Sequence, residues 1–197
     1  MVYLWWLKIT QGPFILNLMR NLFKITFIIG IVFFDFGQAI AEVNYSNLSI
    51  PKVHYKGGQY SPYPSAVDSL LGHVGRRTSI EVNRRPLQMK LSHPNLYQYP
   101  FIYMAGSDSF EPLPLNELRR LRNYLSYGGF LLIDDNSSKA NSKFDISIRK
   151  MIRNLFPQVP LTKISRDHSI FRSFYLINRV TGRRKGNSYL EGINIKG

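Results

Sequence analysis

The sequence predicts an α/β domain with a mostly parallel sheet, and one unit near its middle carries that prediction. An apolar strand, FIYMA at residues 101–105, precedes an amphipathic helix, a Gly128-Gly129 stop and a second apolar strand, FLLI at 130–133. Continuous apolar runs of this length are typical of strands buried on both faces of a parallel sheet. Alternation of strands and helices favours parallel pairing with right-handed crossovers.

Two further strands and a helix are expected before this unit. Val53-His54-Tyr55 is predicted as the first strand, ending at Gly57-Gly58, and Ile80-Glu81-Val82 as the second. Between them, residues 65–76 repeat apolar side chains at the spacing of a helix with one buried face. We expect Ser65 to cap this helix by accepting a hydrogen bond from a free backbone N–H.

Two more helices complete the expected elements. The first runs over residues 115–126, with Asn116 as its cap and Gly128 as the left-handed residue that ends it. Its arginines are expected on the water side: Arg119, Arg120 and Arg122. The second runs over residues 145–156 and ends at Pro157.

The amino-acid composition indicates the charge of a binding partner and excludes chemistry that needs cysteine. The 197 residues suit one domain of ordinary size. Lys and Arg number 26 against 12 Asp and Glu, a formal net charge of +14, which indicates an anionic partner. The chain has no cysteine, so disulfides, a lipid-anchored cysteine and a thiol nucleophile are all excluded.

Residues 1–41 are predicted to consist of a short extension, residues 1–18, followed by a secretory signal peptide. A basic stretch at residues 19–24 precedes a ten-residue apolar block at 25–34 and a small-x-small site, Ala39-Ile40-Ala41. We expect translation to start at Met19 and cleavage after Ala41, leaving one domain over residues 42–197. The alternative is a buried N-terminal helix. An exported, periplasmic domain would meet an anionic envelope surface, whereas a nucleic-acid partner is disfavoured.

Ordered blocks in the chain resemble a known bacterial family. They are KVHYKGG, TSIEV, YPFIYMAG, LRRLRNYLSYGGFLLIDD, the Phe144–Arg149 pattern, LFP, DHSIFRSFY and LEGI, which together cover residues 52–193. This arrangement is similar to the domain-of-unknown-function family numbered 4159, whose activity is not established. The resemblance implies a glutamine amidotransferase-like (class I), flavodoxin-like fold with three α/β/α layers. It also implies envelope partners, since members are often encoded beside AAA ATPases and von Willebrand-type membrane proteins.

The chain departs from the family pattern at two places that bear on function. Members commonly carry Thr-Gly-His-Gly where this chain has Ala105-Gly106-Ser107-Asp108, so a catalytic role of that histidine would be lost here. The family pattern also continues past residues 190–193 into another strand, whereas this chain stops at Gly197. The resemblance therefore implies a sheet truncated at its C-terminus.

The candidate ligand site is a rim at the carboxyl ends of the strands. Related folds place a nucleophile on a tight turn there. The predicted rim residues are Gly106, Ser107, Asp108, Asp134, Asp135, Asn136, Asp167 and His168. Carboxylates in these positions would bind a cation or act as a general base, and the histidine would complete a metal site. The alternative is structural: aspartates that bond loop amides, and a histidine that bonds a loop carbonyl.

Other signals are weaker. The Gly106–Ser109 loop lacks the Gly-Lys-Ser/Thr signature of a phosphate loop, and we expect no cofactor. Arg183, Arg184 and Lys185 form the best candidate basic patch.

Three functions follow from these observations. The favoured one is a non-catalytic envelope binding or scaffold module. The second is a metal-dependent hydrolase that uses Asp134, Asp135 and His168. The third, a nucleic-acid binder, rests on charge alone.

Overall fold

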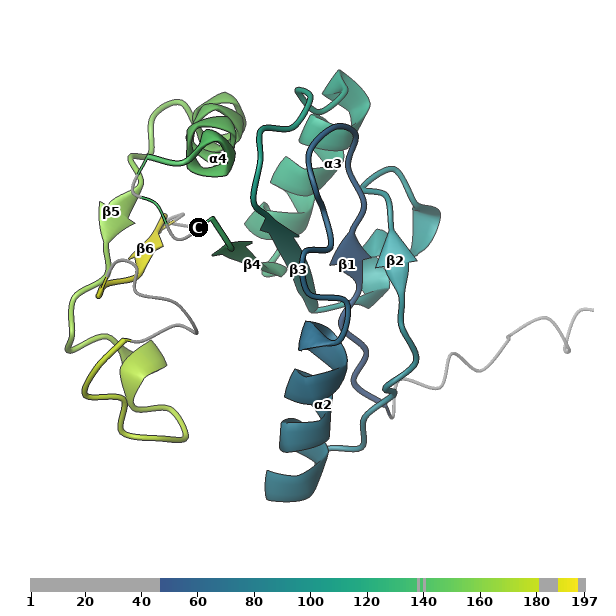
Figure 1. The fold of residues 1–197 in the computed structure, drawn as a ribbon, viewed down its shortest axis with the longest axis vertical. Coiled ribbons are helices and arrows are strands. Elements are labelled where there is room, and N and C mark those ends of the chain that lie inside the picture. The colour runs from purple at the N-terminus through teal and green to yellow at the C-terminus, as the bar shows by residue number, and fades with distance from the viewer. Residues whose placement is uncertain (1–46, 138, 140, 181–187, 195–197) are drawn as a thin grey trace, which may run out of the picture. The chain divides into compact units, whose positions relative to one another are not determined.

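The structure is a computed structural model that describes residues 47–137, 139, 141–180 and 188–194 (Figure 1). These residues belong to one unit, Ser46–Gly197. The expected signal peptide at residues 1–41 and the basic patch at 183–185 lie outside the described residues. Among the helices that are described, none combines the length and the apolar character needed to cross a membrane.

The main sheet has four parallel strands in the order β2-β1-β3-β4. Their bounds are β1 Lys52–Val53, β2 Gln88–Met89, β3 Phe101–Gly106 and β4 Phe130–Asp135. β3 and β4 pair along their whole length, from Phe101 opposite Phe130 to Gly106 opposite Asp135. The predicted α/β class and parallel sheet are thus confirmed, and the FIYMA and FLLI segments are its two longest strands.

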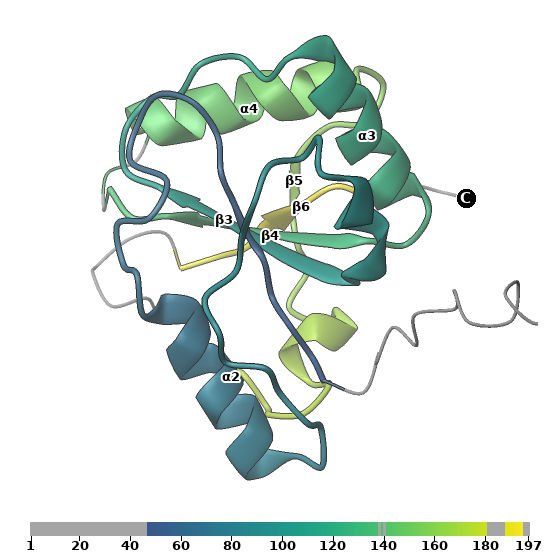
Figure 2. The same cartoon turned by 90° about the vertical axis from the view of Figure 1, so that its right-hand side faces the viewer.

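The helices of the described residues divide between the two faces of this sheet. They are α2 Ala66–Arg77, α3 Leu115–Ser126 and α4 Lys143–Leu155, with short 3₁₀ turns η1 Pro94–Gln98 and η2 Ser169–Phe171. Figure 2 shows α3 and α4 on one side of the sheet and α2 on the other.

Alternation along β3 explains this division, because successive strand residues point to opposite faces. Ile102 and Met104 join a large apolar core with α3 and α4, whose most deeply buried members include Leu121 and Phe144. Tyr103 and Ala105 join a smaller core under α2, together with Ile50, Val67 and Leu71. Each helix therefore buries an apolar face of the kind that its sequence period predicted, although Leu70 of α2 is exposed.

The prediction for the second strand was wrong. Val82 makes one isolated parallel bridge with Leu48, and β2 forms instead at Gln88–Met89, where β1 pairs with it. The β-branched Ile80 and Val82 suggested a strand, but strand formation depends on the neighbour that pairs with the backbone. The first strand likewise covers Lys52–Val53 rather than Val53–Tyr55.

The expected caps were confirmed in part. Ser65 is the cap residue of α2, but its side chain makes no capping hydrogen bond. The prediction for α3 was wrong, because Pro114 and not Asn116 is its cap residue. α4 begins two residues earlier than expected, because the Ser142 hydroxyl accepts a hydrogen bond from the Asp145 amide. Gly128 does adopt the predicted left-handed conformation, with φ of 93°.

Two arginines of α3 do not simply point into water. Nε of Arg122 donates to the Leu155 carbonyl at 2.7 Å and its Nη2 to the Asn154 carbonyl at 2.9 Å, so Arg122 joins α3 to the end of α4. Arg120 donates in the same way to the carbonyls of Leu91 and His93. A guanidinium satisfies several helix-end and loop carbonyls at once, and sequence periodicity does not report this.

A separate antiparallel pair follows α4. β5 (Thr162–Lys163) pairs with β6 (Glu191–Gly192). Arg149 of α4 donates to Glu191 of β6 at 2.6 Å and to Asp145 at 2.9 Å. These ion pairs raise the pKa of the Arg149 guanidinium, mainly through the hydrogen bonds that it donates to the two carboxylates, Asp145 first.

Candidate ligand-site rim at the carboxyl ends of β3 and β4

The parallel register places six of the eight predicted rim residues at one edge of the sheet. Ala105 lies opposite Asp134 and Gly106 opposite Asp135, at the ends of β3 and β4. The Asn136 amide then donates to the Gly106 carbonyl at 2.8 Å, which continues the pairing for one more residue. Ser107 and Asp108 follow directly in the chain, so the end-of-strand reasoning located this group from sequence.

Asp134 is exposed but has a partner within the sheet. The hydroxyl of Tyr103 donates to Oδ2 of Asp134 at 2.7 Å, from one strand to the next. Burial, and then the hydrogen bond and negative charge of Asp134, raise the pKa of the Tyr103 phenol well above its usual range. Tyr103 therefore stays a neutral donor, and it fixes the direction of the carboxylate.

Asp135 uses both of its carboxylate oxygens to build the next segment. Oδ1 accepts from the Ser137 amide at 2.9 Å, and Oδ2 accepts from the Ser142 hydroxyl at 2.6 Å. Ser142 in turn caps α4 by accepting from the amide of Asp145. Asp135 thus organises the turn and the helix start, as the structural alternative expected of an aspartate at this position.

Gly106 allows the strand end to be closed by two aromatic side chains. A Cβ added at Gly106 would overlap the ring of Phe144 and the hydroxyl of Tyr55. That hydroxyl donates to the Ala105 carbonyl at 2.7 Å, and burial raises the pKa of Tyr55. The glycine is therefore required for packing on the α4 side of the rim.

Ser107, which is half-buried, and Asp108, which is exposed, lie just beyond the end of β3. The Ser107 hydroxyl donates to Oε1 of Gln59 at 3.0 Å. Asp108 accepts from the Ser109 amide at 2.8 Å and lies 3.5 Å from the Lys143 ammonium. The Ser109 amide, followed by the charge of Lys143, lowers the pKa of Asp108.

Asp167 and His168 belong to a different local structure. Nδ1 of His168 accepts from the Ile170 amide at 3.2 Å and caps η2, while Asp167 pairs with Arg172 at 3.2 Å. In the part of the chain that the structure describes, no three His, Cys, Asp or Glu side chains are grouped so that they could hold a metal ion. Asp134, Asp135 and His168 therefore do not form the cluster that the metal hypothesis requires.

Sequence reasoning overlooked Lys52, a buried cation in β1. Its Nζ donates to the Pro64 carbonyl at 2.6 Å, the Ser61 hydroxyl at 3.1 Å and the Tyr63 carbonyl at 3.3 Å. Burial lowers the pKa of this ammonium. A lysine between the apolar residues Ile50 and Val53 was the available signal. Its three acceptors indicate that it ties β1 to the loop before α2.

Sequence reasoning also overlooked an apolar strip on β4. Phe130 and Leu132 are exposed on the face of the sheet that carries α2, opposite Phe101 and Tyr103. The rings of Phe101 and Phe130 stack with centroids 5.0 Å apart. Neither Phe130 nor Leu132 is among the side chains of the core under α2. We call Phe130, Leu132 and Phe101 the β4 strip; it leads toward Asp134 at the rim.

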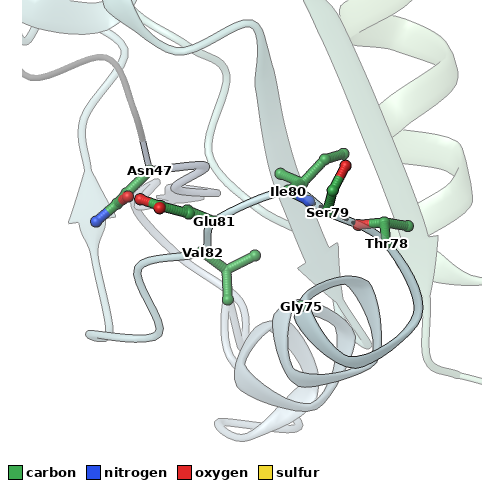
Figure 3. Close-up of a pocket in the computed structure, with 7 residues that line it drawn as sticks. All are labelled: Asn47, Gly75, Thr78, Ser79, Ile80, Glu81 and Val82. Atoms are coloured by element: carbon green, nitrogen blue, oxygen red, sulfur yellow. Dashed lines mark hydrogen bonds between the residues drawn. The ribbon is translucent and has the colours of Figure 1, made fainter.

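A depression lies beside the Leu48–Val82 bridge, at the end of the sheet opposite the rim (Figure 3). It has a volume of about 430 Å³ and is lined by Asn47, Gly75, Thr78, Ser79, Ile80, Glu81 and Val82. The lining comes from the end of α2 and the segments around the Leu48–Val82 bridge, which precede β1 and β2. One carboxylate and no cation face this surface, so its chemistry defines no ligand.

The fold and the rim together define an α/β domain with a parallel sheet and a carboxylate-bearing strand edge. A family model described as "Domain of unknown function (DUF4159)" matches residues 41–196, and the chain belongs to this family. A comparison with curated proteins gave no match.

Proposed function

We propose that this chain is an exported, non-catalytic binding or scaffold module of the bacterial envelope, built on a three-layer, amidotransferase-like fold. The observation that carries the proposal is the use of Asp135. The family resemblance implies that an amidotransferase-like nucleophile would fall at Asp134-Asp135-Asn136, and there both carboxylate oxygens of Asp135 are engaged, by the Ser142 hydroxyl and the Ser137 amide. The absence of cysteine, and Ser107 in place of the family's histidine, support the same conclusion.

The β4 strip is the surface that we assign to a protein partner. It combines two exposed apolar side chains with an edge strand of six residues, and it ends beside the polar rim. An apolar centre bordered by polar groups is the usual composition of a protein interface. The envelope proteins that the family resemblance implies are the expected partners.

A capture experiment tests the binding role. The tagged full-length chain is cross-linked in envelope fractions, and the Phe130→Ser/Leu132→Ser double variant is compared with Ile146→Ser, which alters an exposed apolar residue of α4. A specific partner should be lost with the double variant and retained with the control. Equal capture by all three proteins would contradict the assignment of the strip.

Two further measurements test the remaining parts of the proposal. A reporter enzyme that is active only after export, fused behind residues 1–41, should be active. Asp134→Asn and His168→Ala should leave any hydrolytic activity of the preparation unchanged. Turnover that disappears with either substitution would overturn the non-catalytic assignment.

A further inference from the structure

Four consecutive large apolar side chains project from the loop after η2. Phe174, Tyr175, Leu176 and Ile177 are 63%, 50%, 76% and 45% exposed. Single exposed apolar residues are ordinary on protein surfaces, whereas a contiguous group indicates an interaction site. We call residues 174–177 the apolar loop.

Local contacts hold the apolar loop in shape. The Ile177 amide donates to the Phe171 carbonyl at 2.8 Å, and the ring of Phe171 is itself buried. The Ser173 hydroxyl donates to the Ser169 carbonyl at 2.6 Å. Phe174 and Tyr175 meet edge to face, with ring centroids 4.7 Å apart. The exposed side chains therefore project from a turn that hydrogen bonds and a ring contact hold in place.

The segment that carries this loop is basic. Residues 163–179 contain Lys163, Arg166, Arg172 and Arg179 against one acidic residue, Asp167, which pairs with Arg172. Nη1 of Arg77, at the end of α2, donates to the Tyr175 hydroxyl at 3.0 Å, which brings a further cation to the loop. The Arg166 guanidinium bonds a carbonyl oxygen, which leaves its charge uncompensated.

The chemistry of the loop distinguishes between anionic surfaces. Leu176 and Ile177 are aliphatic and have no ring to stack on a nucleic-acid base, whereas stacking is how single strands are usually held. Aromatic and aliphatic side chains flanked by arginine match a bilayer interface, where rings lie at headgroup level and guanidiniums meet lipid phosphates. The charge of the surroundings selects an anionic bilayer over a neutral one.

We propose that the apolar loop, with Arg77, Arg172 and Arg179 beside it, is a contact site for the surface of an anionic lipid bilayer. The loop side chains enter the headgroup boundary while the arginines stay at the level of the phosphates. This contact does not depend on the β4 strip or on a protein partner there.

The absence of cysteine makes a direct test available, because one introduced cysteine can be labelled uniquely. Asn178→Cys in the full-length chain places an environment-sensitive dye beside the loop, and Asn123→Cys places it on the exposed side of α3 as the control. The probes are vesicles of phosphatidylcholine alone and vesicles with a third of phosphatidylglycerol. We expect a blue shift at position 178 with the anionic vesicles, and none at position 123.

Two sets of substitutions separate the apolar and the charged contributions. Phe174→Ser/Leu176→Ser should abolish the blue shift, whereas Leu115→Ser/Ile146→Ser, at equally exposed positions on α3 and α4, should keep it. In Arg172→Gln/Arg179→Gln, each lost arginine should weaken the vesicle affinity about fivefold. Arg119→Gln/Arg153→Gln removes the same charge from α3 and α4 and should weaken it much less.

Three results would overturn the proposal. The first is an unchanged spectrum at position 178 on anionic vesicles. The second is an equal shift on neutral vesicles, which would remove the role of charge. The third is a shift produced by single-stranded DNA and not by vesicles, which would assign the loop to nucleic acid instead.

Discussion

The hydroxyl of Ser142 donates to Oδ2 of Asp135 at 2.6 Å and joins the end of β4 to the first turn of α4. Oγ of Ser142 also accepts a hydrogen bond from the amide of Asp145. One serine therefore bonds both the end of a strand and the start of a helix. Ser142 is buried, so the loss of Asp135 as its acceptor would leave the serine hydroxyl without that partner in the interior, whereas Asp135 is exposed. The rim is therefore organised by this pair.

Ser142→Ala should lower the free energy of unfolding by about 2 kcal/mol, since it removes the cap of α4 and the hydrogen bond between Ser142 and Asp135. Urea unfolding followed by circular dichroism measures this. Ser147→Ala is the control, because its hydroxyl bonds only a carbonyl within α4, and its effect should be within about 0.5 kcal/mol. Equal losses in both variants would show that Ser142 has no special role.

Gly106→Ala should destabilise the fold by about 2 kcal/mol, because the added methyl group meets the Phe144 ring and the Tyr55 hydroxyl in a packed core. The matched substitution is Gly72→Ala in α2, where a Cβ would make only ordinary contacts with flexible arginine side chains. That change should stabilise the protein by about 0.5 to 1 kcal/mol, since alanine favours the helix. Thermal unfolding of the pair should give shifts of opposite sign.

Lys52→Met should change how stability depends on pH. The pKa of Lys52 is lowered by burial from 10.5, so the unfolded chain binds more protons than the folded one just below pH 10.5. The contribution of this lysine to stability therefore rises as pH increases through that window, and it is least favourable where the folded lysine is protonated. The stability of the native protein relative to Lys52→Met should grow between pH 8 and about pH 10.5.

Urea unfolding of both proteins across this range is the measurement, with Lys90→Met as the exposed control. A difference that stays constant or shrinks with rising pH would contradict the buried position of the ammonium.

Arg122→Lys should lower the free energy of unfolding by about 1 kcal/mol or more, although it keeps the charge. A lysine cannot bond the Asn154 and Leu155 carbonyls in the forked geometry that the guanidinium uses. Arg119→Lys, at an exposed position of the same helix, should have an effect near zero. Amide exchange in the last turn of α4 should rise in Arg122→Lys alone.

The long apolar strands and the amphipathic helices were predictable because their signals are local. The FIYMA and FLLI runs became β3 and β4, and the helix of residues 115–126 was predicted with its observed bounds. The edge that holds Gly106, Asp134 and Asp135 followed from parallel pairing alone. The two-residue strands were not predictable, since Gln88–Met89 becomes a strand only because β1 lies beside it.

The hydrogen bonds of the rim side chains could not be predicted from local sequence signals. The link between Asp135 and Ser142 depends on the position of α4. His168 was grouped with the rim because it follows a strand-like segment, yet the structure uses it as the cap of η2. Charge periodicity likewise placed Arg122 in water, while its guanidinium serves the end of another helix.

The sequence by itself determined the α/β class, the order of its long elements, the basic charge and the absence of a thiol, because each is a property of composition or of local period. Only the tertiary structure decided which side chains at the strand ends face one another and which arginines are engaged. It also decided that Phe130, Leu132 and the apolar loop are exposed among the described residues. Those facts depend on contacts between residues far apart in the chain, and a hydrogen bond or a covered surface exists only once both partners are placed.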